Sequence, residues 1–216
     1  MINDVVRPLT IADQSQIFDI LKSREGKFLY GNMSFDFDTQ KVLYENPKNY
    51  DKSNGMEILG YIDNDGILDC YMTVFYPPEP SHIAFNILGE HVREQSAFLR
   101  TIWSHKNHER KKDQHNFDIN FTKLFIDTFK YFENNGIYTS WGLTPDNFIQ
   151  HSKKNVTFIN ATLKRYVQED FYIPANSLKT TEPHADFINK YILQQGTYKM
   201  NMTARVTSLK PEFRTP

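Results

Sequence analysis

The segment 116–147 constrains the fold of this chain more than any other part of the sequence. Phe121–Phe132 carries apolar and aromatic residues at helical spacing, which predicts a strongly amphipathic helix. Gly136 is expected to end this helix, because glycine takes the left-handed backbone conformation without steric cost. Residues 137–143 then read as a strand, and residues 144–147 as the turn that follows it.

The rest of the chain predicts a mixture of strands and helices. Thr10 begins a helix with a capping side chain, and Asp13 follows three residues later, as in a capping box. Residues 63–66 are rich in side chains that tolerate positive φ, so the strands on either side should form a hairpin. The predicted strands are 5–9, 56–62, 67–76, 82–88, 97–104, 137–143, 163–173 and 198–206, and the predicted helices are 10–26, 35–44, 121–136 and 183–194.

Composition narrows the functional classes. The chain has 216 residues, of which 39% are hydrophobic, so it can bury a large core, and we expect a single domain over 1–216. The net charge of −1 does not favour nucleic acid or an anionic membrane as a partner. Cys70 is the only cysteine, so no intramolecular disulfide can form, and its apolar surroundings favour a buried filler over a nucleophile. The start of the sequence carries no signal pattern, and no apolar run approaches the ~20 residues of a membrane span, so we expect a cytoplasmic protein.

The loop, helix, strand and turn of 116–147 resemble the core of the GCN5-related N-acetyltransferase (GNAT) family. The matching residues are Thr122-Lys123-Leu124 in the helix, Asn135-Gly136-Ile137-Tyr138 at its end, and Pro145-Asp146-Asn147 after the strand. Residues 6–13 also look like the first strand and turn of that family. Over residues 5–173 the resemblance implies an α/β, GNAT-like fold, in which a central mixed, mostly antiparallel sheet is flanked by helices.

The resemblance also implies a cofactor site at the start of the central helix. In the family, an Arg/Gln-x-x-Gly-x-Gly/Ala loop holds the pyrophosphate of acetyl-CoA with backbone N–H groups, and a helix N-terminus suits such an anion. Here Asn116 falls at the first position of that motif, while Ile119 and Phe121 stand where the family has glycine. The candidate cofactor-binding residues are Ser104, Arg110, Lys111, Lys112, Asn116, Asp118, Ile119, Asn120, Phe121 and Asn147.

The implied reaction transfers an acetyl or acyl group from CoA to an amine acceptor, either a small molecule or a peptide. Backbone N–H groups near Ser104 would polarise the thioester, and His105 or a water chain would take the proton of the amine. The family often uses a tyrosine as general acid toward the CoA thiolate, but Lys154 falls near that position here. Tyr166 is the nearest downstream phenol, and it lies on a predicted strand.

Two alternatives belong to other functional classes. The first is a catalytically inactive GNAT-fold binding or scaffold protein that has lost CoA binding, with Phe117, Ile119 and Phe121 buried. The second is nucleotide or nucleic-acid handling through the basic segment 105–115, although a solvated basic loop explains that segment more simply. The sequence also allows a homodimer.

Several residues invite a functional interpretation beside a structural one. His105, His108 and His115 have spacings that suit metal ligands, but no acid or cysteine is placed by pattern to complete a site, so we predict no metal. Trp141 and Tyr138 could line an acceptor pocket, although core residues are the more common use of such rings.

Overall fold

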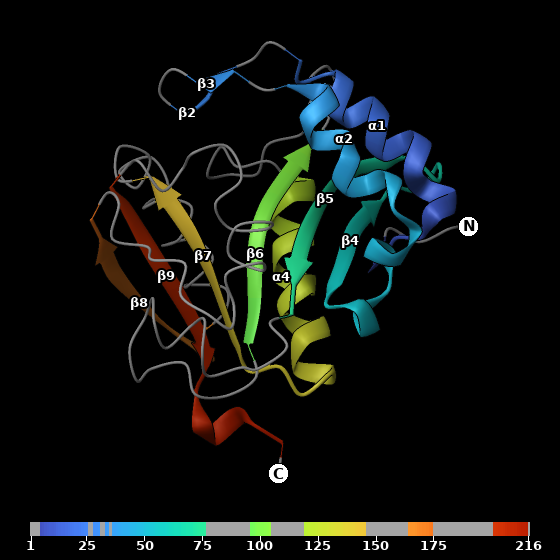
Figure 1. Ribbon diagram of the computed structural model, residues 1–216. Coiled ribbons are helices and arrows are strands. Elements are labelled where there is room, and N and C mark those ends of the chain that lie inside the picture. The colour runs from blue at the N-terminus through green and yellow to red at the C-terminus, as the bar shows by residue number, and fades with distance from the viewer. Residues whose placement is uncertain are drawn as a thin grey trace. The chain divides into compact units, whose positions relative to one another are not determined.

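The computed structural model describes residues 5–25, 28–30, 33–34, 36–76, 96–104, 119–145, 164–174 and 201–215 (Figure 1). The chain divides into two compact units. The first unit comprises Met1–Val74 and Thr101–Tyr131, and the second unit comprises Phe75–Arg100 and Phe132–Pro216. The single domain expected over 1–216 stays a prediction.

The described elements include most of the strands and helices that the sequence predicts, together with the short strands β2 and β3, which it does not predict. The elements in chain order are β1 (Val5–Pro8), η1 (Ile11–Asp13), α1 (Gln14–Lys22), β2 (Phe28–Tyr30), β3 (Met33–Ser34), α2 (Phe37–Glu45), η2 (Pro47–Tyr50), η3 (Lys52–Asn54), β4 (Met56–Ile62), β5 (Leu68–Phe75), β6 (Ser96–Ser104), α4 (Ile119–Asn134), β7 (Thr139–Pro145), β8 (Tyr166–Ile173), β9 (Met202–Leu209) and η7 (Pro211–Phe213).

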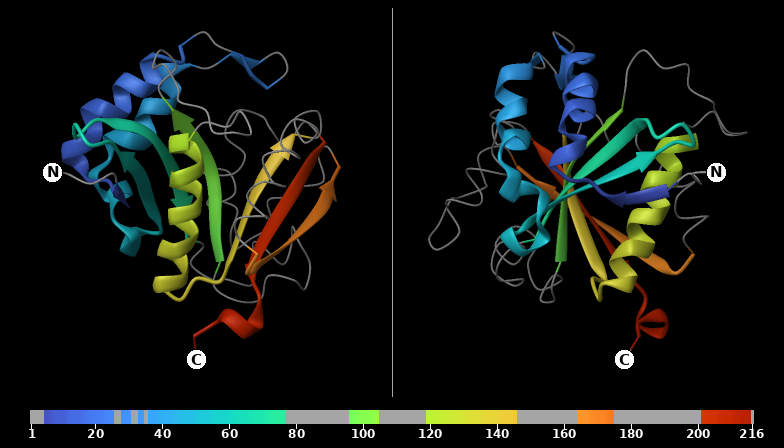
Figure 2. Two further views of the ribbon diagram at one scale, coloured as in Figure 1. Left: turned by 180° about the vertical axis from the view of Figure 1, so that it is seen from behind. Right: turned by 90° about the vertical axis from the view of Figure 1, so that its right-hand side faces the viewer.

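The first unit contains three neighbouring strands in the order β1-β4-β5. Strand β1 pairs with β4 in antiparallel fashion, from Val5 opposite Ile62 to Pro8 opposite Leu59. The turn between β4 and β5 closes where the N–H of Asp63 donates to the carbonyl of Ile67, and Gly66 has a φ of 81°, as the hairpin prediction requires. Helices α1 and α2 lie side by side (Figure 2).

The predicted capping box at the start of the first helix is present. The Oδ2 of Asp13 accepts from the backbone N–H of Thr10 at 2.8 Å. Both Asp13 oxygens also accept from the guanidinium of Arg7, at 2.7 and 3.0 Å. The chain forms a 3-10 turn, η1, before α1 begins at Gln14. This arrangement joins the end of β1 to the first turn of the helical segment.

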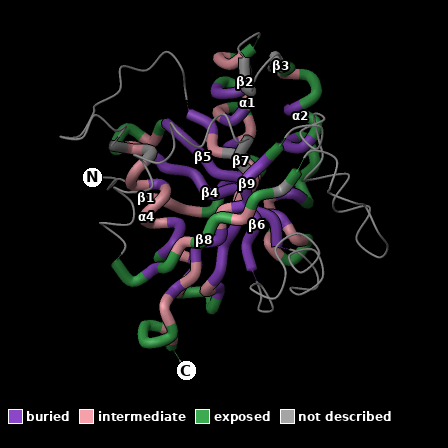
Figure 3. Tube along the Cα trace, turned by 90° about the vertical axis from the view of Figure 1, so that its left-hand side faces the viewer, coloured by how far each residue is buried: buried purple, intermediate pink, exposed green. Residues whose placement is uncertain are grey.

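The second unit contains four strands in the order β6-β7-β9-β8. Strands β6 and β7 run parallel, whereas β9 pairs in antiparallel fashion with both β7 and β8. The sheet strands of the chain are therefore mixed and mostly antiparallel, and the fold combines them with helices, as predicted. Strand β9, which has a strand on each side, is buried along most of its length (Figure 3).

The core of each unit is rich in aromatic side chains, as the composition suggests. In the first unit, Tyr44 and Tyr71 meet edge to face at 5.5 Å. In the second, the rings of Phe98 and Trp141 lie 4.5 Å apart, and the indole N–H of Trp141 donates to the Oγ of Ser96. Trp141 is therefore a core residue, as its structural interpretation predicted, and Cys70 is fully buried, as expected for a filler of the core.

Several element boundaries differ from the sequence prediction. Helix α4 begins at Ile119, and Gly136 (φ 70°) ends it as expected, with the N–H of Ile137 donating to the carbonyl of Phe132. Residues 45–54, which the sequence assigns to neither a helix nor a strand, contain the 3-10 turns η2 and η3, because Asn46 and Asp51 cap them with their side chains. Strand β8 begins at Tyr166, not at residue 163, and β9 continues to Leu209. Pro145 belongs to β7, not to the turn after it, and the predicted strand 82–88 and helix 183–194 lie outside the described residues.

None of the helices in the described part of the chain is long and apolar enough to cross a membrane.

Candidate functional site

The first turn of α4 is the feature on which the cofactor prediction depends. The first N–H groups of any helix lack acceptors within the helix, and the partial positive charge of the helix lies at this end. Asn120, the second residue of α4, donates from its side-chain amide to the Oδ2 of Asp69 on β5, at 3.2 Å. Asp69 is buried, with 6% of its surface exposed. The buried carboxylate of Asp69 therefore lies beside the first turn of α4, where the cofactor prediction places a phosphate.

Further polar contacts anchor α4 on strand β4 within the first unit. The ammonium of Lys123 lies 3.3 Å from the hydroxyl of Tyr61 and 5.4 Å from the centre of its ring. Near the other end of the helix, Tyr131 donates to the Oε1 of the buried Glu57 at 2.7 Å. Burial, and then the hydrogen bond to Glu57, raise the pKa of Tyr131 above its ordinary value. These contacts fix the axial position of α4, and hence its first turn, against β4 and β5.

The end of β6 is held by an arginine that the sequence analysis did not single out. Arg24, just after α1, donates from Nε to the carbonyl oxygen of Ser104 at 2.9 Å. Its Nη2 donates to the Oγ of the same residue at 2.8 Å. Ser104 is the last residue of β6 and was predicted to lie near the thioester. No sequence pattern identifies Arg24, because its partner is 80 positions further along the chain.

In the part of the chain that the structure describes, strands β6 and β7 pair over their first residues. The register runs from Ser96 opposite Thr139 to Phe98 opposite Trp141. Beyond Trp141, β7 keeps its pairing with β9 as far as Pro145. At Gly142 an added Cβ would lie 3.1 Å from the carbonyl oxygen of Leu99, so glycine permits the close approach of the two strands there. Among the described residues, the parallel pairing thus ends before the last residues of β6.

Tyr166, which was predicted as a general acid, has a structural partner. Its hydroxyl donates to the Oε1 of Glu133 at 2.5 Å, and the Oε2 of Glu133 lies 2.9 Å from Arg165. Burial raises the pKa of Tyr166, and the hydrogen bond to Glu133 raises it further. Glu133 is in the last turn of α4, roughly 20 Å along the axis from the first turn. Its role as a proton donor to CoA stays a prediction, and the contact itself fixes the start of β8 on the end of α4.

The remaining predicted site residues are described partly or not at all. Ile119 and Phe121 lie in the first turn of α4, and the structure describes their backbone only. No three His, Cys, Asp or Glu side chains gather as metal ligands in the described ranges. The residues outside those ranges are His105, His108, Arg110, Lys111, Lys112, His115, Asn116, Phe117, Asp118, Asn147 and Lys154.

Comparison with known proteins identifies the fold. No protein-family model matches the sequence, and no curated protein is significantly similar to it. The structure is similar to that of a probable acetyltransferase from Staphylococcus epidermidis, with a TM-score of 0.53 and 12% identity over 96% of this chain and 99% of the other.

Two further solved structures give the same result. One is an acetyltransferase of the GNAT family from Streptococcus pneumoniae (TM-score 0.52, 9% identity, 96% of this chain and 100% of that chain). The other is a GNAT superfamily phosphinothricin acetyltransferase from Sinorhizobium meliloti in complex with acetyl-CoA (TM-score 0.51, 10% identity, 96% and 89%). The order of strands and helices, the parallel β6–β7 pair and these likenesses together show that the chain has the fold of the GNAT acetyltransferases.

Proposed function

We propose that this protein is a GNAT-like N-acyltransferase, which transfers an acetyl or other acyl group from CoA to an amine acceptor. The observation that carries the proposal is the parallel pair β6–β7, whose ladder stops after Phe98 and Trp141 and whose strands are linked through α4. Proteins with similar structures include a phosphinothricin acetyltransferase in complex with acetyl-CoA and a spermidine N-acetyltransferase chimera.

In this proposal the first turn of α4 receives the CoA diphosphate. The donors there are backbone N–H groups, which suit an anion at the positive end of a helix. The basic residues Arg110, Lys111 and Lys112 would pair with the phosphates of the adenosine part. Bound acetyl-CoA would supply the thioester that the amine attacks.

At the acyl end, the chain would contribute the end of β6 and a base. Backbone N–H groups near Ser104 would stabilise the oxyanion that develops on the acyl carbonyl. Arg24 holds Ser104 through its carbonyl and hydroxyl oxygens, so this strand end is fixed before a ligand arrives. His105 follows at once in the sequence and would accept the proton that the amine releases.

A second candidate function is a binding or scaffold protein with a GNAT fold that has lost CoA binding. The contact between Asn120 and Asp69 favours it, because it puts a carboxylate beside the helix start where a diphosphate would lie. The sequence favours it too, since Ile119 and Phe121 replace the two glycines of the family's loop.

Calorimetry and thermal denaturation with millimolar acetyl-CoA distinguish the two candidates. The acyltransferase should give a saturable heat of binding and a higher melting temperature, since a ligand that binds only the folded state stabilises it. If acetyl-CoA gives neither a heat of binding nor a higher melting temperature, the protein is not an acyl-CoA transferase. The binding or scaffold function is then the better supported one.

A further inference from the structure

One arginine holds the last residue of β6 with three hydrogen bonds. The Nε and Nη2 of Arg24 both donate to the carbonyl oxygen of Ser104, at 2.9 and 2.5 Å. The Nη2 also donates to the Oγ of Ser104, at 2.8 Å. Both residues lie in the first unit. A single guanidinium thus fixes the backbone carbonyl and the side chain of one residue at the same time.

Arg24 belongs to a short segment that is attached to two helices. Its backbone N–H donates to the carbonyl of Leu21 on α1 at 2.9 Å, and Leu21 is completely buried. The next residue, Glu25, accepts from the backbone N–H of Phe37, the first residue of α2, at 2.6 Å. The guanidinium that reaches Ser104 therefore extends from a part of the chain that both helices of the first unit hold in place.

The contact between Arg24 and Ser104 is charge-assisted and largely shielded from water. Ser104 is 8% exposed, and its neighbour Trp103 is 9% exposed. A hydrogen bond from a charged donor is stronger than a neutral one, and its electrostatic part grows where water is excluded. A cation on a peptide oxygen also polarises that peptide group and the groups hydrogen-bonded in series with it. Arg24 therefore acts on the backbone of the strand end, and not only on a side chain.

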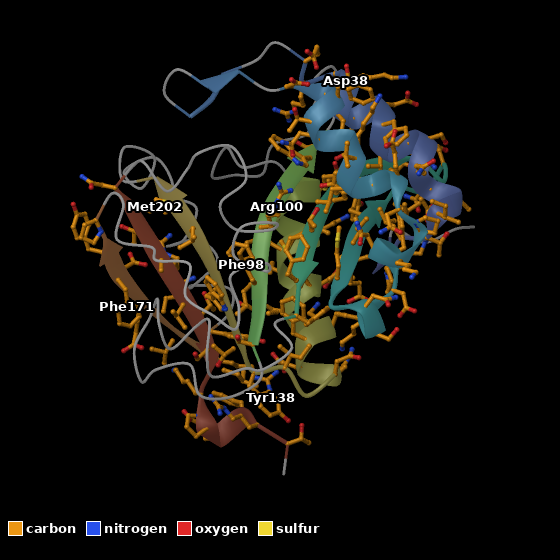
Figure 4. All side chains as sticks on the ribbon, viewed as in Figure 1. Asp38, Phe98, Arg100, Tyr138, Phe171 and Met202 are labelled. Atoms are coloured by element: carbon orange, nitrogen blue, oxygen red, sulfur yellow. The ribbon has the colours of Figure 1, made fainter. Side chains whose placement is uncertain are left out.

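The pairing of β6 with β7 does not reach this strand end in the part of the chain that the structure describes. It ends at Phe98, which Figure 4 labels, opposite Trp141 on β7. Ser104 is the last residue of β6, several positions further on. The hydrogen bonds from Arg24 thus hold the end of β6 where pairing with β7 does not.

We propose that Arg24 is a positioning residue for acyl transfer, which holds and polarises the end of β6 through the carbonyl oxygen of Ser104. The inference rests on the proposed function, in which backbone N–H groups near Ser104 stabilise the oxyanion on the acyl carbonyl. Such donors work only when they are already aimed at the reacting atom, because a misplacement of about 1 Å can cost roughly 100-fold in rate. A lysine could not replace Arg24, since an ammonium is a point donor without the fixed fork of a guanidinium.

Infrared spectroscopy of acetyl-CoA that is isotope-labelled at the acyl carbonyl tests the proposal on the full-length protein. Donors aimed at the carbonyl oxygen weaken the C=O bond. The parent protein should therefore lower the stretching frequency of the bound acyl carbonyl below that of free acetyl-CoA. Arg24→Met should lose most of this shift. It should still bind CoA, which has no acyl group, with the affinity of the parent protein.

Two further variants complete the test. Arg24→Lys keeps the charge but not the fork, so it provides the measurement if Arg24→Met does not fold, and it should also lose most of the shift. Arg7→Met is the matched control, because Arg7 likewise joins two segments of the first unit, through hydrogen bonds of 2.7 and 3.0 Å to Asp13. It should lower the melting temperature and leave the carbonyl frequency unchanged.

The two proposals fail in different ways. If acetyl-CoA gives the parent protein no heat of binding, the proposed function is wrong, and the role of Arg24 is wrong with it. If the parent protein binds acetyl-CoA but both Arg24 variants keep the same carbonyl frequency, the role of Arg24 is overturned while CoA binding stands. A bound carbonyl that absorbs like that of free acetyl-CoA has the same consequence. A loss of the shift in Arg7→Met as large as in Arg24→Met would also overturn the role of Arg24, because stability alone would then explain the effect.

Discussion

The side-chain amide of Asn120 donates to the carboxylate of Asp69. This hydrogen bond joins the first turn of α4 to strand β5. A negative charge here is favourable for the helix itself, because it lies near the positive end of the helix dipole. The same charge opposes any second anion that approaches the turn.

Asp69→Asn should therefore tighten the binding of CoA. We expect the dissociation constant to fall about two- to fivefold, since one charge near a helix terminus is worth roughly 0.3–1 kcal/mol. Calorimetry at low salt measures the change. Asp127→Asn is the control, because Asp127 lies further along the same helix and pairs with Lys130. If Asp69→Asn and the parent protein bind CoA with equal affinity, the charge of Asp69 does not affect CoA binding.

Phe121→Gly should restore one glycine of the family's phosphate loop. Removing the ring lets a diphosphate approach the backbone of the first turn more closely, so CoA binding should tighten. The melting temperature should fall, because glycine in a helix costs about 1 kcal/mol relative to alanine. Phe121→Ala separates the two effects, since it removes the ring without the backbone freedom. If Phe121→Gly melts lower and still gives no heat with CoA, the scaffold function gains support.

Tyr166→Phe separates the structural role of Tyr166 from a catalytic one. Loss of the bond to Glu133 should lower the free energy of unfolding by about 1–3 kcal/mol, because it removes a hydrogen bond to a charged group. CoA binding should not change, since Glu133 lies in the last turn of α4. Urea denaturation and calorimetry provide the two measurements. If acyl transfer falls steeply while stability is unchanged, Tyr166 is the general acid after all.

The pKa of Tyr166 adds a pH dependence to this prediction. It is raised in the folded state, so the contact contributes its full stability below the ordinary tyrosine pKa of about 10 and loses it as the pH rises above that value. The parent protein should therefore lose more stability above pH 10 than Tyr166→Phe does.

Asp13→Asn should destabilise the start of the first helical segment. Burial acts to raise the pKa of Asp13, but the hydrogen bonds from Arg7 and Thr10 outweigh it and hold the pKa below its ordinary value. The stabilisation by Asp13 is then complete above the unfolded-state pKa of about 3.9, and it is lost as the pH falls through the lower folded-state value. At pH 7 the variant should lose on the order of 1–2 kcal/mol of unfolding free energy.

Denaturation in urea at pH 7 and pH 3 checks this prediction. The difference between Asp13→Asn and the parent protein should be smaller at pH 3. Asp38→Asn removes an exposed partner of Lys41 and should change stability little at either pH. A difference for Asp13→Asn that is independent of pH would show that its charge is not what stabilises the segment.

The local features of this fold could be predicted from the sequence because their causes are local. The apolar spacing of α4, the capping pair Thr10 and Asp13, and the glycines at 66 and 136 each act on residues a few positions away. The GNAT-like fold could be predicted as well, because the matching residues of 116–147 are contiguous in the chain. Element ends were less predictable; Pro145 stays in β7 because its neighbour β9 supplies the pairing.

The partners of the candidate site were decided by the tertiary structure alone. Asp69 and Asn120, Arg24 and Ser104, and Glu133 and Tyr166 are brought together from distant parts of the sequence. The register of three strands places Ser140 opposite Thr207 and Thr207 opposite Gln168, and shifting one strand by a single residue would turn its side chains to the other face. The sequence by itself thus determined most of the described helices and strands and their order, but not the short strands β2 and β3. The tertiary structure decided which polar groups form hydrogen bonds, through the pairing of strands and the packing of helices. Hydrogen bonds act over about 3 Å in space, whatever the separation of the two residues along the chain.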